Sequence, residues 1–259
     1  MRLWKRIHIT RRRVLGGVLG VLVLTAALAS VPPAAKRAVA QGERRLPIYC
    51  VQTDKPQVSV SFDAAWGADD TDRLLQILKE NDVKATFFLC GYWVEKYPEE
   101  VKKIAAEGHD LGNHSATHPH MSQISAEEIT QELQKCHANV KKLTGREMEL
   151  FRAPFGEYDN HVIETAEENG YYTIQWDVDS LDWKEQGAEA EIKQVLGHKH
   201  LGNGSIILFH NDAKYTPEVL DTILKGIKEK GFEIVPISEL IHRGSFEIDH
   251  EGRQILKKA

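Results

Sequence analysis

The sequence predicts an α/β fold built around a parallel sheet or barrel. Strand-like and helix-like stretches alternate in about seven units, and no Gly/Ser-rich linker interrupts them. The chain has 259 residues, of which 42% are hydrophobic and 27% charged. This composition is typical of a globular protein and excludes a mostly disordered or multi-span membrane protein. We therefore expect one sizeable α/β domain.

The predicted strands are short runs rich in β-branched, aromatic and other apolar residues. The run 58–62 is β-rich, and 85–90 is largely apolar, as in a strand that is buried on both faces. The remaining strands are expected at 110–112, 149–152, 171–176, 205–209 and 232–235.

The predicted helices show apolar residues at helical spacing and recognisable ends. In 71–81 the first residue, a threonine, is the expected N-cap. Ser125-Ala-Glu-Glu128 has the form of a capping box, so a helix should run from there to Leu143, before Gly145. The other helices are expected at 99–107, 160–169, 188–196, 217–230 and 238–241.

Charge divides the chain near residue 45. Residues 1–45 carry ten Lys or Arg and one acid, whereas the rest of the chain carries 23 basic and 37 acidic residues. Phosphate affinity depends on Lys and Arg, so we expect no nucleic-acid partner for this acidic body.

The first 31 residues have the order of a secretory signal, with a basic cluster, an uncharged run at 14–31 and small residues near its end. A helix of this run would cover about 27 Å, so it could also remain uncut as a single membrane anchor. Residues 10–15 also match a twin-arginine export signal loosely. Both readings predict an extracytoplasmic protein, membrane-anchored or secreted.

After this segment we expect a connector at 32–55, one domain at 56–242 and a polar, peripheral tail at 243–259. We expect a monomer. The cysteines have no metal-type spacing. Cys90 is expected to be a small buried hydrophobe, and a disulfide between Cys50 and Cys136 stays open.

Charged or ionisable side chains follow several predicted strands at their carboxyl ends. In parallel α/β folds, functional side chains gather at this edge of the sheet. Five separate strands end in this way, which predicts a single convergent site. The residues are Asp63, His114, Arg152, Asp177 with Asp179, and His210.

Two histidines, His114 and His118, are four residues apart and could face one metal ion, because imidazole suits Zn, Co, Fe or Ni. The alternative is that one caps a turn and the other is exposed. The nearby His109 and His120 are expected at the surface.

The carboxylates suggest acid–base chemistry. Asp63 could be a general base or a turn former, and Arg152 could hold it in its ionised form or make an ordinary structural ion pair. An aspartate of the 177–182 segment that bonds His210 would favour the charged, acidic imidazolium. Trp183 could line a sugar-sized pocket or simply pack in the core.

Five short motifs occur in order along the chain: Ser61-Phe62-Asp63, His114-xxx-His118-Pro119, Arg152-Ala-Pro154-Phe-Gly156, Asp179-Ser-Leu-Asp182-Trp183 and Leu208-Phe-His210. Together they resemble the motifs of the NodB-type polysaccharide deacetylases, a group of the carbohydrate esterase family 4 type. The resemblance covers about residues 56–242. Within the family, Phe62-Asp-Ala-Ala-Trp-Gly67 is most similar to the PdaB-like sporulation deacetylases. This similarity implies a bacterial envelope protein, with the forespore envelope as one expected location.

The resemblance implies a distorted (β/α) barrel of about seven strands that removes N-acetyl groups from an amino-sugar polymer. Peptidoglycan is the first expected polymer and a chitin-like polymer the second. The implied cofactor is a divalent metal, Zn or Co, Ni, Fe or Mn. The implied roles are a metal site at His114 and His118, catalysis by Asp63, Arg152, His210 and Asp182, and substrate binding by Trp183, Leu208, Asp179 and Pro154.

In these roles Asp63 would be the base on a metal-bound water, positioned by Arg152, and His210 the general acid oriented by Asp182. Two positions depart from the family pattern. Ala64 stands where a second aspartate usually provides a third metal ligand, and Asn211 stands where the family often has Asp. Water or a nearby carboxylate, Asp69 or Asp70, could complete the shell. The sequence thus leaves two hypotheses, an active deacetylase and a weakened or inactive glycan-binding envelope protein.

Overall fold

The computed structural model describes residues 43–257 of the chain. Contacts divide the chain into one unit at Met1–Arg44 and a second at Arg45–Ala259, which holds the fold described below. The predicted signal or anchor at 1–31 lies outside the described residues. Between residues 43 and 257, every helix is too short or too polar to cross a bilayer.

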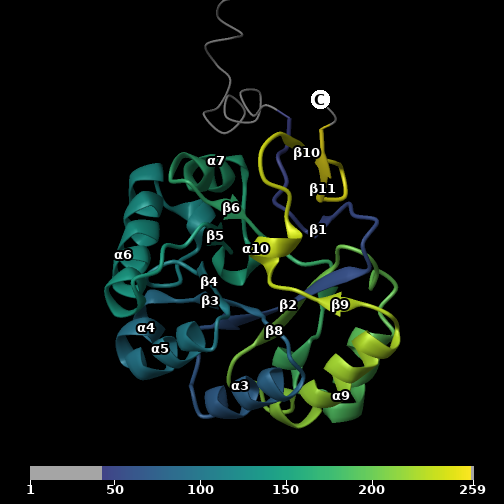
Figure 1. The fold of residues 1–259 in the computed structure, drawn as a ribbon. Coiled ribbons are helices and arrows are strands. Elements are labelled where there is room, and N and C mark those ends of the chain that lie inside the picture. Colours follow the sequence, from purple (N-terminus) through teal and green to yellow (C-terminus); the bar gives the residue numbers. More distant parts are fainter. Residues whose placement is uncertain (1–42, 258–259) are drawn as a thin grey trace, which may run out of the picture. The chain divides into compact units, whose positions relative to one another are not determined.

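The centre of the second unit is an open half-barrel of parallel strands (Figure 1). Its strand order is β6-β5-β4-β3-β2-β8-β7, and each neighbouring pair is parallel. The predicted barrel-like α/β fold is therefore confirmed. The strands are β2 (Gln57–Ala64), β3 (Thr86–Leu89), β4 (Asp110–Asn113), β5 (Leu150–Phe151), β6 (Tyr172–Thr173), β7 (Val178–Asp179) and β8 (Ile206–His210), with β9 (Glu233–Ile234) paired to the start of β2.

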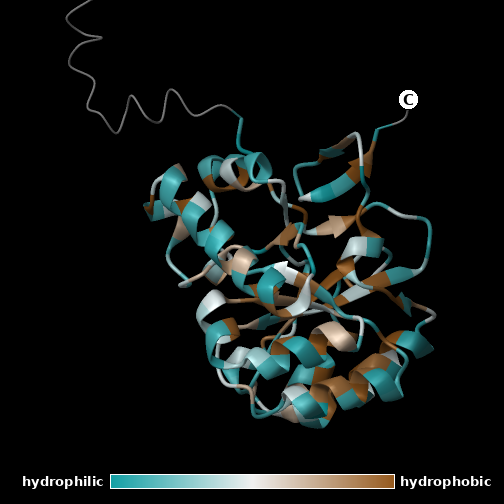
Figure 2. Ribbon diagram, turned by 60° about the vertical axis from the view of Figure 1, so that its left-hand side comes forward, coloured by the Kyte–Doolittle hydropathy of each residue, from teal (hydrophilic) through white to brown (hydrophobic). Residues whose placement is uncertain are grey.

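Helices surround these strands, and Figure 2 shows that they carry both hydrophilic and hydrophobic residues along their length. They are α3 (Thr71–Glu80), α4 (Gly91–Lys96), α5 (Pro98–Ala106), α6 (Ala126–Thr144), α7 (Asn160–Glu168), α8 (Ala188–Leu196), α9 (Thr216–Glu229) and α10 (Ile237–Leu240). Single 3₁₀ turns occur at η1 (Met121–Gln123), η2 (Pro154–Gly156) and η3 (Asp182–Lys184).

The predicted ends of α6 are confirmed. The Ser125 hydroxyl accepts from the Glu128 backbone N–H, and the Glu128 carboxylate accepts from the Ser125 N–H. At the other end Gly145 adopts φ 72°, a left-handed conformation that glycine tolerates best. The predicted cap of α3 is wrong, because Asp70 is the N-cap and Thr71 is already helical.

Strand β2 is buried on both faces, which explains its position in the middle of the sheet. Val58, Val60 and Phe62 are fully buried, and so are the alternate residues Ser59 and Ser61. Phe62 stacks on aromatic rings from both neighbouring strands, Phe87 at 5.0 Å and Phe209 at 5.7 Å. This packing fixes the central strand on which the site is built.

A small three-stranded sheet joins segments that the sequence places outside the domain. It contains β1 (Cys50–Val51), β11 (Arg253–Leu256) and β10 (Phe246–Ile248), with β1 and β11 parallel. The predicted boundaries at 56 and 242 are thus corrected, because parts of the connector and tail belong to the folded unit. This pairing between the two ends of the unit leaves no local signal in the sequence.

The three cysteines are buried and free. The open possibility of a Cys50–Cys136 disulfide is therefore not realised. The prediction for Cys90 is confirmed, since its side chain is fully buried in the hydrophobic core.

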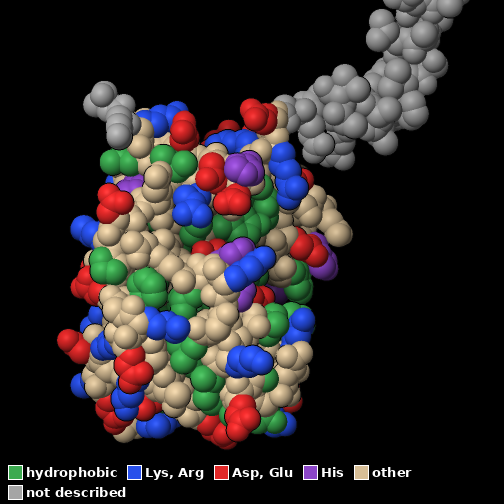
Figure 3. All heavy atoms as spheres, turned by 90° about the vertical axis from the view of Figure 1, so that its right-hand side faces the viewer, with side chains coloured by type: hydrophobic (Ala, Val, Ile, Leu, Met, Phe, Trp, Pro, Cys, Tyr) green, Lys and Arg blue, Asp and Glu red, His purple; other side chains and the backbone are tan. Residues whose placement is uncertain are grey.

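Acidic and basic side chains are interspersed over the face shown in Figure 3. Mixed charges of this kind produce only weak fields at a distance. This face therefore gives no support to electrostatic attraction of a polyanion, and the absence of a nucleic-acid partner stays a prediction.

Candidate active site

The carboxyl ends of the central strands bring the predicted residues together. Asp63 on β2 and His210 on β8 are register partners in adjacent parallel strands. His114 directly follows β4, and Arg152 directly follows β5. The predicted convergence of these strand ends is what the structure shows, and it creates two groups of contacts, one around Asp63 and one around His210.

Asp63 and Arg152 form a buried ion pair. The guanidinium Nη1 donates to Asp63 Oδ1 at 2.7 Å, and Nη2 donates to the Ser61 hydroxyl at 3.0 Å and to the Gln175 carbonyl at 3.1 Å. Arg152 is fully buried and lies over the Phe88 ring. Burial alone would raise the pKa of Asp63, but the charges of Arg152, His114 and His210 and the Arg152 hydrogen bond together outweigh it and hold that pKa below its usual value.

The two predicted metal-binding histidines converge on one point. His114 Nε2 and His118 Nε2 are 3.2 Å apart. The other nitrogen of the first ring, His114 Nδ1, is 2.8 Å from the Arg152 carbonyl oxygen, to which it can only donate. This bond leaves His114 Nε2 without a proton. Burial lowers the pKa of both imidazoles, that of His118 to about 4.

This pair fits a divalent metal. Two nitrogens at about 2.0–2.1 Å from a tetrahedral ion lie roughly 3.3 Å apart, close to the separation of the two rings. Metal-binding histidines usually donate their other N–H to a carbonyl or carboxylate, as His114 does to Arg152. The remaining oxygen of the base, Asp63 Oδ2, lies 3.8 Å from His114 Nε2.

A third protein ligand is missing from the part of the chain that the structure describes, because no cluster of three or more His, Cys, Asp or Glu donors occurs there. Ala64 is fully buried and offers only a methyl group. Asp70 is buried and its Oδ2 accepts from the Asp212 backbone N–H at 2.7 Å, but it belongs to no cluster of donors with the two histidines among the described residues. Asp69 is exposed. The described residues therefore supply two imidazoles and no third donor.

The second group of contacts surrounds His210. Its Nδ1 is 2.8 Å from Asp182 Oδ1, and its backbone N–H donates to Asp182 Oδ2 at 2.6 Å. Asp182 also accepts from the Trp183 N–H at 2.7 Å. Burial would lower the pKa of His210, but the hydrogen bond and charge of Asp182 outweigh it, so the pKa is raised. This arrangement favours a protonated imidazole.

The sequence analysis missed Trp66 as a site residue. Its ring stacks on the His210 ring at 5.0 Å with an interplanar angle of 12°, although 48% of the residue is exposed. Asn211 holds the backbone beneath it, accepting from the N–H groups of Ala65 and Trp66 and donating to the Gly67 carbonyl. An aspartate at 211 could not make that last bond, which gives the Asp-to-Asn departure a physical reason.

The predicted substrate-binding residues occupy different environments. Trp183 is 49% exposed and adjoins the His210 group, whereas Leu208 is almost fully buried on β8. The Asp179 carboxylate accepts from the Leu181 N–H at 2.8 Å and so stabilises its own turn. Pro154 is buried in η2. Trp183 alone among these four presents a broad exposed surface.

A further missed residue is Phe155, which is 57% exposed and adopts φ 59°. Its ring meets the edge of His118 at 4.5 Å and stacks on His120 at 4.5 Å. Only the preceding Arg-Ala-Pro motif points to this position in the sequence. Phe155 therefore forms an exposed aromatic wall beside the histidine pair.

Two other polar residues have structural roles. His109, expected at the surface, is buried, and its Nδ1 accepts from the Ala85 N–H at 3.1 Å. Asp177 is drawn away from the site, because its Oδ1 accepts from the Ile206 N–H at 2.9 Å and its Oδ2 from the Ser205 hydroxyl at 3.0 Å. His120 is exposed, as expected, and pairs with Glu157.

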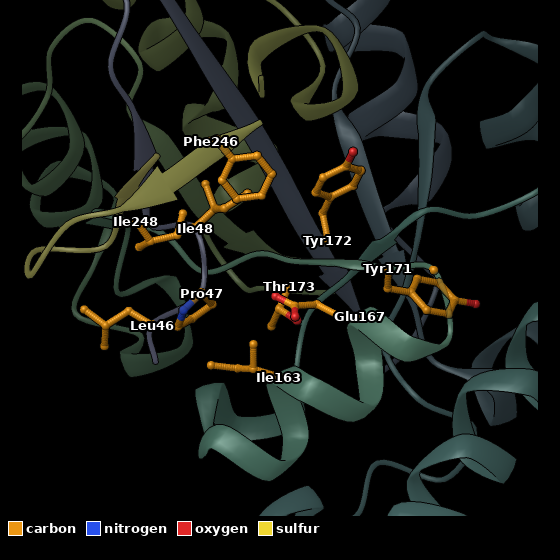
Figure 4. Close-up of a pocket in the computed structure, with 11 residues that line it drawn as sticks. Leu46, Pro47, Ile48, Ile163, Glu167, Tyr171, Tyr172, Thr173, Phe246 and Ile248 are labelled. Atoms are coloured by element: carbon orange, nitrogen blue, oxygen red, sulfur yellow. The ribbon is translucent and has the colours of Figure 1, made fainter. Parts of the chain in front are cut away.

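A separate apolar cavity of about 280 Å³ lies between the start of the described chain, α7, β6 and β10 (Figure 4). Ile48, Ile163, Tyr172 and Phe246 are among the residues that line it. None of the predicted site residues takes part, so this cavity is distinct from the two groups described above.

Comparisons of the chain with a family model and with known proteins agree on one family. A family model described as polysaccharide deacetylase matches residues 51–174. The chain is similar to the uncharacterized protein YlxY of Bacillus subtilis, with 36% identity over 195 residues, 75% of this chain and 60% of the relative. It therefore spans less than two thirds of that relative. A Bacillus cereus peptidoglycan-N-acetylglucosamine deacetylase is 34% identical over 191 residues, 72% of this chain and 69% of the relative.

Solved structures include both enzymes and a pseudoenzyme. BA3943 of Bacillus anthracis, described as a CE4 family pseudoenzyme, matches with a TM-score of 0.71 and 36% identity, over 75% of this chain and 68% of that one. A BA3943 mutant described as having restored enzymatic activity matches with a TM-score of 0.72. The Bc1960 peptidoglycan N-acetylglucosamine deacetylase matches with a TM-score of 0.71 and 32% identity, over 75% of this chain and 92% of that one.

Proposed function

The chain belongs to the polysaccharide deacetylase family, and from this membership we propose that it hydrolyses N-acetyl groups of a cell-envelope amino-sugar polymer, with peptidoglycan as the first substrate. The observation that carries the proposal is the pairing of a buried base, Asp63 on Arg152, with a separate acid, His210 on Asp182, on adjacent strands. Amide hydrolysis needs both groups, one to activate water and one to protonate the leaving amine.

Asp63 supplies the base. Its Oδ1 is occupied by Arg152, which leaves Oδ2 as the oxygen that takes a proton from the attacking water. The lowered pKa keeps this carboxylate ionised and ready to accept. The water oxygen adds to the acetyl carbonyl carbon, and a tetrahedral species forms.

His210 supplies the acid. Because its Nδ1 is bonded to Asp182, Nε2 is the nitrogen that can donate to the departing amine. Proton transfer lets the C–N bond break, which yields acetate and the free amino sugar. The raised pKa of His210 keeps a proton available for this step.

A divalent metal bound at His114 and His118 would polarise the acetyl carbonyl and acidify the attacking water. His114 is oriented for this role by the Arg152 carbonyl, and His118 by its contact with Phe155. The exposed ring of Trp66 stacks on His210, and the exposed Trp183 directly follows Asp182; both rings would present flat surfaces to a sugar ring.

The proposed setting is outside the cytoplasmic membrane of a bacterium, with a role in sporulation as a further part of the proposal. The support is the signal-like pattern of residues 1–31 and the PdaB-like motif at 62–67. A monomer that acts on a glycan polymer, secreted or anchored through 14–31, agrees with this pattern.

The test is acetate release by the full-length chain from peptidoglycan and chitin oligomers, with and without added Zn²⁺, Co²⁺ or Mn²⁺. We expect release from peptidoglycan that depends on metal and disappears in the isosteric variant Asp63→Asn. Folded protein that releases no acetate from any substrate with any of these metals would contradict the proposal.

Ala64 supports a second candidate, a glycan-binding envelope protein with weak or no turnover. The described residues hold no third metal donor, and a similar chain, BA3943, is described as a pseudoenzyme. This candidate predicts glycan binding that is equal in wild type and Asp63→Asn, measured by pull-down with insoluble peptidoglycan. Binding without acetate release favours it over the enzyme.

A further inference from the structure

A buried carboxylate that the proposed reaction does not use lies behind the acid. Glu191 on α8 is only 5% exposed, and its Oε1 accepts from the Thr216 hydroxyl at 2.8 Å. Thr216, the first residue of α9, is fully buried, and its Oγ1 is also 3.4 Å from Asp182 Oδ2. A continuous line of contacts thus runs from Glu191 through Thr216 and Asp182 to His210.

We propose that Thr216 and Glu191 are positioning residues that set how tightly Asp182 holds the proton of His210. This inference rests on the proposed function only in calling His210 the acid. The coupling itself is a property of the four side chains and exists whether or not the protein turns over substrate.

The coupling follows from the single proton of the Thr216 hydroxyl, which can be donated to only one oxygen at a time. When Glu191 is neutral, its own O–H can donate to Thr216 Oγ1, and the Thr216 proton is free for Asp182. When Glu191 is ionised, it is the stronger acceptor and takes the Thr216 proton at 2.8 Å. Asp182 then loses that donor.

Both states are accessible near neutral pH. Burial, with a further contribution from the charge of Asp182, raises the pKa of Glu191 to about 7 although the Thr216 bond opposes this. Ionisation of Glu191 adds a negative charge behind Asp182 and removes one of its donors. Both changes strengthen the attraction between Asp182 and the imidazolium, so they make His210 a weaker acid.

Other charged groups also act on His210 and Glu191, and they are the same in the wild type and in a variant at position 191. His210 is influenced by Asp182 from η3, Asp63 from β2 and Asp179 from β7. Glu191 is influenced by Asp182 alone among charged groups, and by the Thr216 hydroxyl of α9. A substitution at 191 therefore changes one charge and leaves the other groups in place.

The experiment is an NMR titration of the His210 imidazole in the full-length chain, with its signals identified by their loss in His210→Gln. Glu191→Gln keeps a hydrogen-bonding side chain but carries no charge. We expect it to lower the pKa of His210 by roughly 0.5–1 unit. Glu189→Gln, an exposed carboxylate on the same helix, is the matched control and should leave that pKa unchanged.

Thr216→Val tests the bridge. In this background the effect of Glu191→Gln should become smaller, because only the through-space charge remains. An effect of the same size in both backgrounds would overturn the role of Thr216. An unchanged His210 pKa in Glu191→Gln, with the protein folded, would overturn the proposal as a whole.

Acetate release separates this inference from the proposed function. If the wild type releases acetate, the alkaline limb of its pH profile should move toward lower pH in Glu191→Gln. If it releases none while the NMR shift is present, the proposed reaction fails and the coupling stands. If the wild type releases acetate but Glu191→Gln leaves the His210 pKa unchanged, the proposed reaction stands and the coupling fails.

Discussion

The two groups of the candidate site differ in completeness. Around His210 the hydrogen bonds are in place, because Asp182 accepts from the ring and backbone of His210 and from the backbone of Trp183. Around His114 and His118, two nitrogens converge but the described chain offers no third donor. The His210 group thus has its hydrogen bonds in place, whereas a metal bound at the histidine pair would need further ligands from water or substrate.

The largest effect is expected at the base. Asp63→Asn keeps the shape of the side chain but removes the acceptor of the water proton, so acetate release should fall by about 10²–10⁴-fold. The measurement is initial acetate release at saturating metal, with the thermal midpoint as a check on folding. A loss below tenfold would mean that another group acts as the base.

The second largest effect is expected in the His210 group. In Asp182→Asn the amide cannot accept from both the ring and the backbone of His210, so the His210 pKa should fall and the rate should drop roughly 10²-fold. Rates measured between pH 5 and 9 should show that the alkaline limb moves toward acid. A drop with an unchanged pH profile would assign Asp182 a purely structural role.

At the pair of His114 and His118, an added protein ligand should increase the affinity for metal. Ala64→Asp should raise the affinity for Zn²⁺ by at least about tenfold, and acetate release should rise with it. Metal content after dialysis measures the first effect, and removal by a chelator should abolish it. Ala65→Asp, one residue along the chain, is the control. Equal metal affinity in the two variants would show that position 64 does not face the metal.

The smallest effect concerns stability and pH. The folded-state pKa of Glu191, about 7, lies above its ordinary value of 4.5, so folding favours the protonated form. Its contribution is fully present below about pH 4.5 and is lost as the pH rises through 7. In Glu191→Gln the free energy of unfolding should therefore decline less between pH 5 and 8. Urea unfolding at several pH values measures this, and parallel curves would contradict it.

The sequence predicted the strand ends well because parallel strands are short, apolar and bounded, and because their carboxyl ends meet at one edge. Asp63, His114, Arg152 and His210 all lie where that rule puts them. The residue types at these positions then indicated acid–base chemistry and a histidine metal site. Asp177 satisfied the same rule but bonds to the backbone of β8, which only tertiary structure reveals.

The missed features depend on contacts between distant segments. Trp66 and Phe155 lie on loops whose ring contacts with His210 and His118 follow no local periodicity. The pairing of β1 with β11 joins residues about two hundred positions apart, as Cys50 and Arg253 illustrate. Burial of His109 likewise depends on the turn that brings it to the Ala85 N–H.

The buried ion pair of Asp63 and Arg152 gives the proposed base a role in the stability of the fold as well as in catalysis. Arg152 is fully buried and forms an ion pair with Asp63, and removing the partner of such a buried charge typically costs about 3–5 kcal/mol. A lineage that no longer needs hydrolysis would still be selected to keep Asp63. A methyl group at 64, packed among apolar neighbours, carries no such penalty. In this architecture the fold itself stabilises an anion at position 63, whereas it places no such demand on position 64.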